Sequence, residues 1–289
     1  MIHALCSIQA NTQTVYSAQL LAYSWRRMGQ PDPLTFLCAS GEAEVEGFEV
    51  VPTSDMTNFD GNFYPPYNKP IGILEYLGRH GDRLGSHSIL VLDPDMLLVE
   101  PLPDLQATPG RVVCDGPWDW IAENFTGPKI VERSRRPELV RASGVPYLVD
   151  ATDLEMICPQ WIAHIRRLRA DHLPQLGWVA EMTGWDLAVA DVGLETELRQ
   201  WSCGPLLHYH GAPPSARCLA PYPWNKTTYR WRNWDEPPEV PEGMHTTAVQ
   251  FHDMLQEYAA LRRQEVHAQG WALAGREPAP ELALDPQAP

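Results

Sequence analysis

The sequence predicts an α/β fold of Rossmann-like type, in which helices flank a mostly parallel sheet. Three observations predict this class. The chain opens with a strand, a polar turn and an amphipathic helix, an order typical of nucleotide-binding α/β units. The run Ile89–Leu92 is short and apolar on both faces, as expected of a buried strand. The carboxylates Asp93 and Asp95 follow it, at the strand end where open α/β folds bind ligands.

The first unit lies at the N-terminus. Ile2–Ile8 is the predicted strand and Gln9–Gln13 the polar turn. In Thr14–Met28 apolar side chains recur at helical spacing, and Gly29 follows as a C-cap. The turn has no G-x-G-x-x-G pattern, which argues against a dinucleotide fold. Thr12 either offers its hydroxyl to a bound nucleotide or caps the helix.

The following segments continue the α/β pattern. Leu34–Cys38 and Phe48–Val51 are predicted strands, Asn58–Lys69 is a predicted loop, and Pro70 is predicted to open a Leu-rich helix. The later predicted strands are Arg111–Cys114, Tyr147–Asp150 and Leu206–His210. The later predicted helices are Pro159–Ala170, which Thr152 precedes as a possible N-cap, a helix starting at Gly177, and Thr246–Gln264.

One stretch and the tail allow different interpretations. The mixed-charge run Arg133–Arg141 is either a lid on the acceptor side of a site or a solvated helix, and we favour the solvated helix. We predict a single domain over residues 1–264 and a disordered tail over residues 272–289, which are rich in alanine and proline.

Composition excludes several classes of partner. The 289 residues carry a net charge of −15, which argues against nucleic acid or an anionic membrane, where lysine and arginine must neutralise phosphates. The six cysteines are far apart without zinc-site spacing, so we expect them to be reduced. We find no secretory leader and no apolar run of about eighteen residues. We therefore expect no membrane span and a cytoplasmic location.

The acid pair suggests a metal site. Two ionised carboxylates flanking the rigid Pro94 are stabilised best by a cation, and hard oxygen donors favour Mg²⁺ or Mn²⁺ with positions open to the phosphates of a substrate. An ordinary Asp-Pro turn is the alternative. Two acids rarely complete a metal shell, so we looked for a third ligand. His208 or His210, at the end of a late strand, is the candidate.

Other charged residues are candidates for substrate contacts. Lys69 and Lys226 are placed to hold phosphate, one before a helix start and one in an aromatic stretch, although either can be plain surface charge. Glu181 and Asp186 lie at a Trp-flanked helix start, where they either act on a sugar or simply favour the helix N-terminus.

Several motifs together resemble a known family. The motifs that carry the resemblance, in this order, are Asn68-Lys69-Pro70, Leu92-Asp93-Pro94-Asp95-Met96, Pro101-Leu102-Pro103-Asp104-Leu105, Pro159-Gln160-Trp161, Gly177-Trp178-Val179-x-Glu181-Met182 and Leu207-His208-Tyr209. With them the chain is similar, from near residue 1 to about residue 260, to the hydroxyproline O-arabinosyltransferases and the related peptidyl serine galactosyltransferases.

The resemblance implies a GT-A fold and a divalent cofactor, Mn²⁺ or Mg²⁺. It also implies transfer of a sugar from a nucleotide donor, UDP-linked in our interpretation, to a hydroxyl on a peptide with retention at the anomeric carbon. Asp93, Asp95 and His208 match its metal ligands, and His210 is kept as a contact of the nucleotide sugar. Glu181 matches an acid at a helix start, and its role toward donor or acceptor is our inference.

Two departures qualify the resemblance. Eukaryotic members carry a membrane anchor that we do not find, which puts the hydroxyproline acceptor in doubt and keeps a small-molecule acceptor open. Asp93-Pro94-Asp95 stands where many members have Glu-Pro-Asp. Two other functions are weighed: a nucleotide-sugar-binding protein without turnover, and a sugar-1-phosphate nucleotidyltransferase. The nucleotidyltransferase would need a Gly-rich loop after the first strand, and Gln9–Gln13 contains no glycine.

Overall fold

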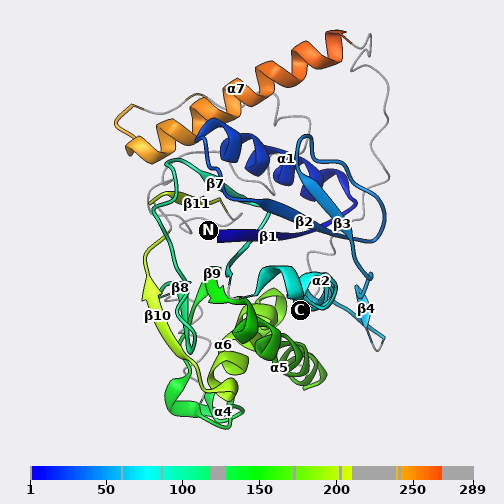
Figure 1. Cartoon of the computed structure of the whole chain (residues 1–289), viewed down its shortest axis with the longest axis vertical. Helices are drawn as coiled ribbons and strands as arrows, with labels where there is room; N and C mark the ends of the chain where they lie inside the picture. Colours follow the sequence, from blue (N-terminus) through cyan, green and yellow to red (C-terminus); the bar gives the residue numbers. More distant parts are fainter. Residues whose placement is uncertain are drawn as a thin grey trace.

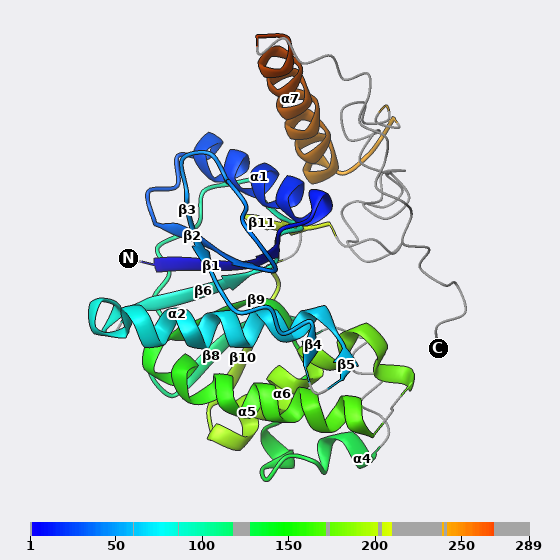
Figure 2. The same ribbon diagram turned by 90° about the vertical axis from the view of Figure 1, so that its right-hand side faces the viewer.

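The structure is a computed structural model, and it describes residues 2–59, 61–85, 87–117, 128–171, 174–201, 204–209, 239 and 242–268. It confirms the predicted α/β class. A central sheet lies between helix α1 (Thr12–Arg27) on one face and helices α2 (Asn68–Leu84) and α5 (Ala151–Ala170) on the other (Figures 1 and 2). The predicted tail over residues 272–289 lies outside the described residues.

The sheet has seven strands in the order β10-β8-β9-β6-β1-β2-β3. In chain order they are β1 (Ile2–Gln9), β2 (Leu34–Ala39), β3 (Glu49–Pro52), β6 (Ser88–Leu92), β8 (Arg111–Asp115), β9 (Gly144–Asp150) and β10 (Glu195–Arg199). Neighbouring strands are parallel except that β9 runs antiparallel to both β6 and β8. The mostly parallel, Rossmann-like sheet is therefore confirmed.

The centre of the sheet is formed by β1 and β6. Most residues of β1 and every residue of β6 are buried, because helices cover both faces of the sheet. Cys6 of β1 pairs with Leu92, the last residue of β6, and β1 continues in the same direction to Gln9. The turn after β1 and the acid pair after β6 consequently lie at the same carboxyl edge.

A second, small sheet carries the chain beyond this edge. Strand β7 (Met96–Leu98) pairs antiparallel with β11 (Leu206–His208). The remaining α-helices within the described ranges are α4 (Pro128–Val131), α6 (Ala180–Val192) and α7 (Thr246–Ala268). Helix α7 crosses α1 on the outer side of the molecule (Figure 1).

The prediction that Asn58–Lys69 forms a loop is wrong in part. It contains the short pair β4 (Asn58–Phe59) and β5 (Asn62–Phe63), then a 3₁₀ helix, η1 (Pro65–Tyr67). Helix α2 follows directly and begins before Pro70. Aromatic packing explains why this segment has regular structure: the rings of Tyr64 and Tyr67 pack edge to face, with their centroids 5.5 Å apart.

Helix α5 starts earlier than predicted. Asp150 rather than Thr152 is its N-cap, and its carboxylate accepts a hydrogen bond from the Thr152 backbone N–H. Pro159 lies inside the helix instead of opening it. The helix continues because its neighbours Cys158 and Trp161 are fully buried, and their packing outweighs the missing backbone donor of the proline.

Strand β10 was not predicted, because its sequence is largely charged. It lies at the edge of the sheet, where charged residues are common and prevent pairing with other chains. The helix predicted from Gly177 starts as a 3₁₀ segment, η3 (Pro174–Val179), and becomes α6 only at Ala180. Gly177 has φ of +30°, which interrupts the helical geometry between the two.

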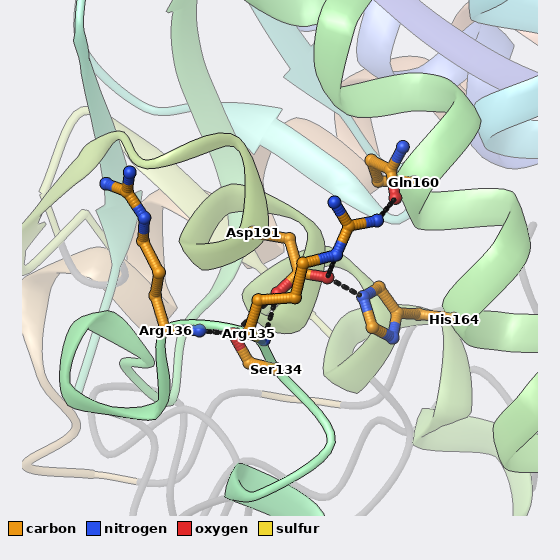
Figure 3. Close-up of polar contacts among 6 residues, drawn as sticks. All are labelled: Ser134, Arg135, Arg136, Gln160, His164 and Asp191. Atoms are coloured by element: carbon orange, nitrogen blue, oxygen red, sulfur yellow. Dashed lines mark hydrogen bonds and ion pairs between the residues drawn. The ribbon is translucent and has the colours of Figure 1, made fainter.

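The charged run Arg133–Arg141 is not a helix, which corrects the favoured interpretation. Its regular structure is one 3₁₀ turn, η2 (Pro137–Leu139). Figure 3 shows how the preceding residues are fixed to α6: Asp191 accepts hydrogen bonds from the Ser134 hydroxyl at 2.7 Å and the Arg135 backbone N–H at 2.6 Å. The ring of His164 on α5 contacts the other Asp191 oxygen at 2.9 Å.

Two smaller expectations concern cysteines and membranes. Within the described residues Cys6, Cys38, Cys114 and Cys158 are free and buried, as expected of reduced core residues. Among the helices of the described ranges, none combines the length and the apolar character that crossing a bilayer requires.

Candidate functional site

The acid pair lies where the sequence predicts it, directly after the buried strand β6. Asp93 is partly exposed, and Asp95 is only 7% exposed. Strand β7 begins at the next residue, so Asp95 is fixed between two regular elements. A carboxylate held this deeply needs a positive partner or hydrogen bonds.

His208 is brought to the acid pair by the pairing of β7 with β11. His208 lies opposite Met96 in this register, next to Asp95. The His208 Nε2 atom is 3.4 Å from Asp95 Oδ1, and one ligand atom from each of Asp93, Asp95 and His208 lies within 4.8 Å of the other two. The three residues that the sequence proposes as metal ligands therefore converge.

The donor set fits a divalent cation. Two carboxylates supply hard oxygen atoms, and an imidazole adds a nitrogen that Mn²⁺ accepts more readily than Mg²⁺ does. Asp95 and His208 are both more than nine-tenths buried, which holds their side chains in place. That this cluster binds a metal remains a prediction.

Lys69 links the acid pair to a second acid. Its Nζ atom is 2.6 Å from Asp93 Oδ1 and 3.1 Å from Glu181 Oε2. Lys69 lies in the first turn of α2, and Glu181 in the first turn of α6. Burial lowers the pKa of Lys69, but the charges of Asp93 and Glu181 outweigh burial and raise it above its ordinary value. Lys69 is therefore a buried cation shared by two carboxylates.

Glu181 is held by its backbone as well as by Lys69. Its N–H donates to the Tyr64 hydroxyl oxygen at 2.8 Å, and its carbonyl accepts from the indole of Trp161 at 2.7 Å. Burial raises the pKa of Glu181, although Lys69 opposes the shift. Among the described residues its second oxygen, Oε1, has no hydrogen-bond partner. A buried carboxylate oxygen without a partner can accept a hydrogen bond from a hydroxyl group of a substrate.

Asp186 lies deeper in the core, on the same helix as Glu181. Its carboxylate accepts hydrogen bonds from the Ser143 hydroxyl at 2.5 Å and from the Ser143 backbone N–H at 3.3 Å. Burial raises the pKa of Asp186, and the Ser143 hydrogen bonds oppose the rise. These contacts give Asp186 a structural role, and a contact with sugar or acceptor remains a prediction.

Comparison with known proteins identifies the family. Residues 3–198 match the sequence model of the Hydroxyproline O-arabinosyltransferase family N-terminal domain. The chain belongs to this family. It is also 25% identical over 242 residues to a peptidyl serine alpha-galactosyltransferase of Arabidopsis thaliana. That match covers 74% of the chain and 28% of the relative, so the chain corresponds to less than a third of the relative's length.

The residues matched to the hydroxyproline O-arabinosyltransferase family include only part of the candidate site. Lys69, Asp93, Asp95 and Glu181 lie inside the matched residues, whereas His208 lies beyond residue 198. The resemblance found in the sequence is thus confirmed at the level of the family. The third candidate ligand rests on the geometry of β7 and β11.

Three proposed contacts of the nucleotide cannot be placed. Thr12 is the first residue of α1, and nothing is described of its side chain. The capping alternative for Thr12 is wrong, because Asn11 is the N-cap and accepts a hydrogen bond from the Thr14 backbone N–H at 3.0 Å. His210 and Lys226 lie outside the described residues.

Sequence reasoning missed two tyrosines of this site. Tyr64 is 2% exposed and contacts the backbone at the start of α6. Tyr209 is also 2% exposed, and its N–H donates to the carbonyl of Asp95 at 3.0 Å. The available signals were the aromatic character of the segment before Lys69 and the position of Tyr209 directly after His208.

Proposed function

We propose that this chain is a metal-dependent, retaining glycosyltransferase of the GT-A type, which moves a sugar from a UDP-linked donor to a hydroxyl group. The observation that carries the proposal is the convergence of Asp93, Asp95 and His208, whose ligand atoms lie within 4.8 Å of one another. It occurs at the carboxyl edge of a Rossmann-like sheet, in a member of the hydroxyproline O-arabinosyltransferase family. Nucleotides bind at this edge in open α/β folds.

The proposed acceptor is a hydroxyl on a peptide. The name of the Arabidopsis relative describes transfer of galactose to peptidyl serine, and the family name describes transfer of arabinose to hydroxyproline. Both acceptors are alcohols carried by a peptide, although the sugars differ. The shared chemistry supports a peptide hydroxyl, with a small-molecule alcohol as the alternative.

Asp93, Asp95 and His208 would hold Mn²⁺, because a shell of two carboxylates and one imidazole suits this ion. When bound, the ion supplies positive charge that stabilises the diphosphate leaving group. Lys69 adds a cation beside Asp93 and keeps Asp93 and Glu181 together despite their like charges. We keep Lys69 as a candidate contact of the donor phosphates as well.

Retention requires either a carboxylate nucleophile or attack from the face that the diphosphate leaves. Glu181 is the candidate nucleophile, because Lys69 fixes one of its oxygens and Oε1 has no partner among the described residues. Its oxygen would bond to the anomeric carbon as the bond to the phosphate oxygen breaks. The acceptor hydroxyl would then attack the same carbon from the opposite face, displace the Glu181 carboxylate and pass its proton to the released diphosphate, which restores the original configuration.

The test is a donor screen with Mn²⁺ present. The full chain is incubated with UDP-galactose or UDP-arabinose and peptides that contain serine or hydroxyproline, and free UDP and glycosylated peptide are measured. We expect both products, and we expect the Asp95→Ala variant to lose them while remaining folded. Asp104→Ala is the matched control, because Asp104 is exposed and outside the metal cluster.

The same screen separates the other functions. Exchange of pyrophosphate in place of UDP release would identify a sugar-1-phosphate nucleotidyltransferase, and tight binding of UDP-sugar without either product would identify a binding protein. Wild-type rates in Asp95→Ala would overturn the metal assignment.

A further inference from the structure

The segment around β11 contacts the metal ligands from beyond the family-matched residues. Tyr209, directly after His208, donates its backbone N–H to the Asp95 carbonyl at 3.0 Å. Its hydroxyl donates to the Pro94 carbonyl at 3.5 Å. The buried residue Tyr209 therefore contacts the backbone of Pro94 and Asp95, and it is the residue that follows His208 in the chain. The position of Tyr209 determines the relative position of two of the three candidate ligands.

Helix α7 confines the ring of Tyr209. Phe251 on α7 is fully buried, and its ring centroid lies 5.2 Å from that of Tyr209 at an interplanar angle of 35°. Both belong to a hydrophobic cluster that is separate from the main core and is formed by α1, β7, β11 and α7. Part of the packing around Tyr209 is thus provided by the last helix of the described chain, and the rest by α1 and the small sheet.

An ion pair attaches α7 to α1 at a distance along the helix from Phe251. The guanidinium of Arg27 contacts both Glu257 oxygens, at 2.7 and 2.9 Å, and the hydroxyl of Tyr23 donates to Glu257 at 2.8 Å. Bidentate pairs of this geometry are stronger and more specific than ordinary surface pairs. This contact fixes how α7 lies on α1. Helix α1 in turn contacts β7, because the Ser24 hydroxyl oxygen accepts a hydrogen bond from the Leu98 N–H at 3.0 Å.

We propose that α7 is a brace for the metal centre and that Tyr209 is a positioning residue for Asp95 and His208. The proposal rests on the proposed function, because it presupposes that the three ligands bind Mn²⁺. Metal affinity depends on how firmly the groups behind the ligands orient them. Loosening α7 should therefore weaken Mn²⁺ binding even where the change is far from every ligand.

The test measures the Mn²⁺ dissociation constant of the full chain by electron paramagnetic resonance of the free ion. Phe251→Ala should raise it about tenfold, the lower end of the effect seen for groups that support metal ligands. Leu261→Ala is the matched control, because Leu261 is on the same helix but 43% exposed. We expect Leu261→Ala to bind Mn²⁺ as the wild type does.

Charge reversal provides a second, reversible perturbation. Glu257→Arg places two guanidinium groups against each other and should weaken Mn²⁺ binding several-fold. The double variant Arg27→Glu with Glu257→Arg restores opposite charges and should recover most of the affinity. Because these side chains are partly exposed, the variants are expected to fold even if Phe251→Ala does not.

The outcomes separate this inference from the proposed function. Absence of Mn²⁺ binding by the wild type would overturn the metal centre, and the brace with it. Wild-type Mn²⁺ affinity in folded Phe251→Ala and Glu257→Arg proteins would overturn the brace alone. A loss of thermal stability without a change in Mn²⁺ affinity would also overturn it, because α7 would then have a purely structural role.

Discussion

Lys69 Nζ lies 2.6 Å from Asp93 Oδ1, and the Lys69 side chain is only 9% exposed. The contact joins the first turn of α2 to the residue that follows β6. Because the same Nζ atom also contacts Glu181, two buried or half-buried carboxylates depend on one cation. The cost of losing that cation can be measured.

Replacing Lys69 by methionine should destabilise the protein strongly. The variant keeps the length of the side chain but leaves Asp93 and Glu181 without their cation, and breaking a buried pair in this way costs about 3–5 kcal/mol. Urea denaturation of metal-free protein measures the loss. Arg79→Met on the same helix is the control, since Arg79 is half exposed and pairs only with Glu75 in the ion pairs of the described residues. A loss below about 1 kcal/mol for Lys69→Met would contradict a shared buried cation.

Glu181→Gln and Asp186→Asn should separate catalysis from structure. Glu181→Gln keeps the shape but removes the nucleophile, so we expect transfer to fall about 100-fold or more with Mn²⁺ affinity retained. Asp186→Asn should instead lower stability by about 1–3 kcal/mol, because the two Ser143 donors bond to different Asp186 oxygens and the asparagine amide group cannot accept from one of them. Steady-state kinetics and urea denaturation are measured on both. Equal losses of kcat/KM in the two variants would place Asp186 at the substrate as well.

The fold could be predicted where local patterns decide it. The buried run of β6 and the amphipathic stripe of α1 are local signals, and both elements formed as expected. Helix α5 was predicted to begin at Pro159 because proline is a strong local signal, but burial of Trp161 and Cys158 overrides it. Strand β10 has no local signal, because an edge strand with charged side chains does not alternate clearly.

The site could be predicted in part for the same reason. Asp93 and Asp95 follow a recognisable strand, so their place at the sheet edge could be read from the chain. Their proximity to His208 depends on the pairing of β7 with β11, which joins segments far apart in sequence. The place of Tyr209 beside His208 is visible in the sequence, but its backbone contact with Asp95 and its packing on α7 are tertiary contacts that the sequence pattern does not predict.

Because of Asp191, the stability of the folded protein should depend on pH in the acid range. Burial raises its pKa, but hydrogen bonds from Ser134, Arg135 and His164 outweigh burial and lower the pKa below its ordinary value. The unfolded state therefore binds a proton first, so this stabilisation is complete above about pH 4 and is lost as pH falls through the folded pKa. Asp191→Asn should lower the melting temperature at pH 7, and the difference from wild type should shrink below about pH 4. A difference that is constant with pH would mean that the Asp191 charge contributes nothing.

Mn²⁺ should stabilise the folded chain in proportion to its affinity. The unfolded chain has no preformed cluster, so an ion at about 100 times its dissociation constant adds about 2.7 kcal/mol. For a chain of this size that corresponds to a rise of roughly 4 °C in melting temperature. His208→Ala should abolish most of the rise, whereas His80→Ala on α2 should leave it unchanged, because His80 is outside the cluster of Asp93, Asp95 and His208. Calorimetric scans with EDTA or Mn²⁺ measure the shift, and an equal rise in His208→Ala would show that the histidine is not a ligand.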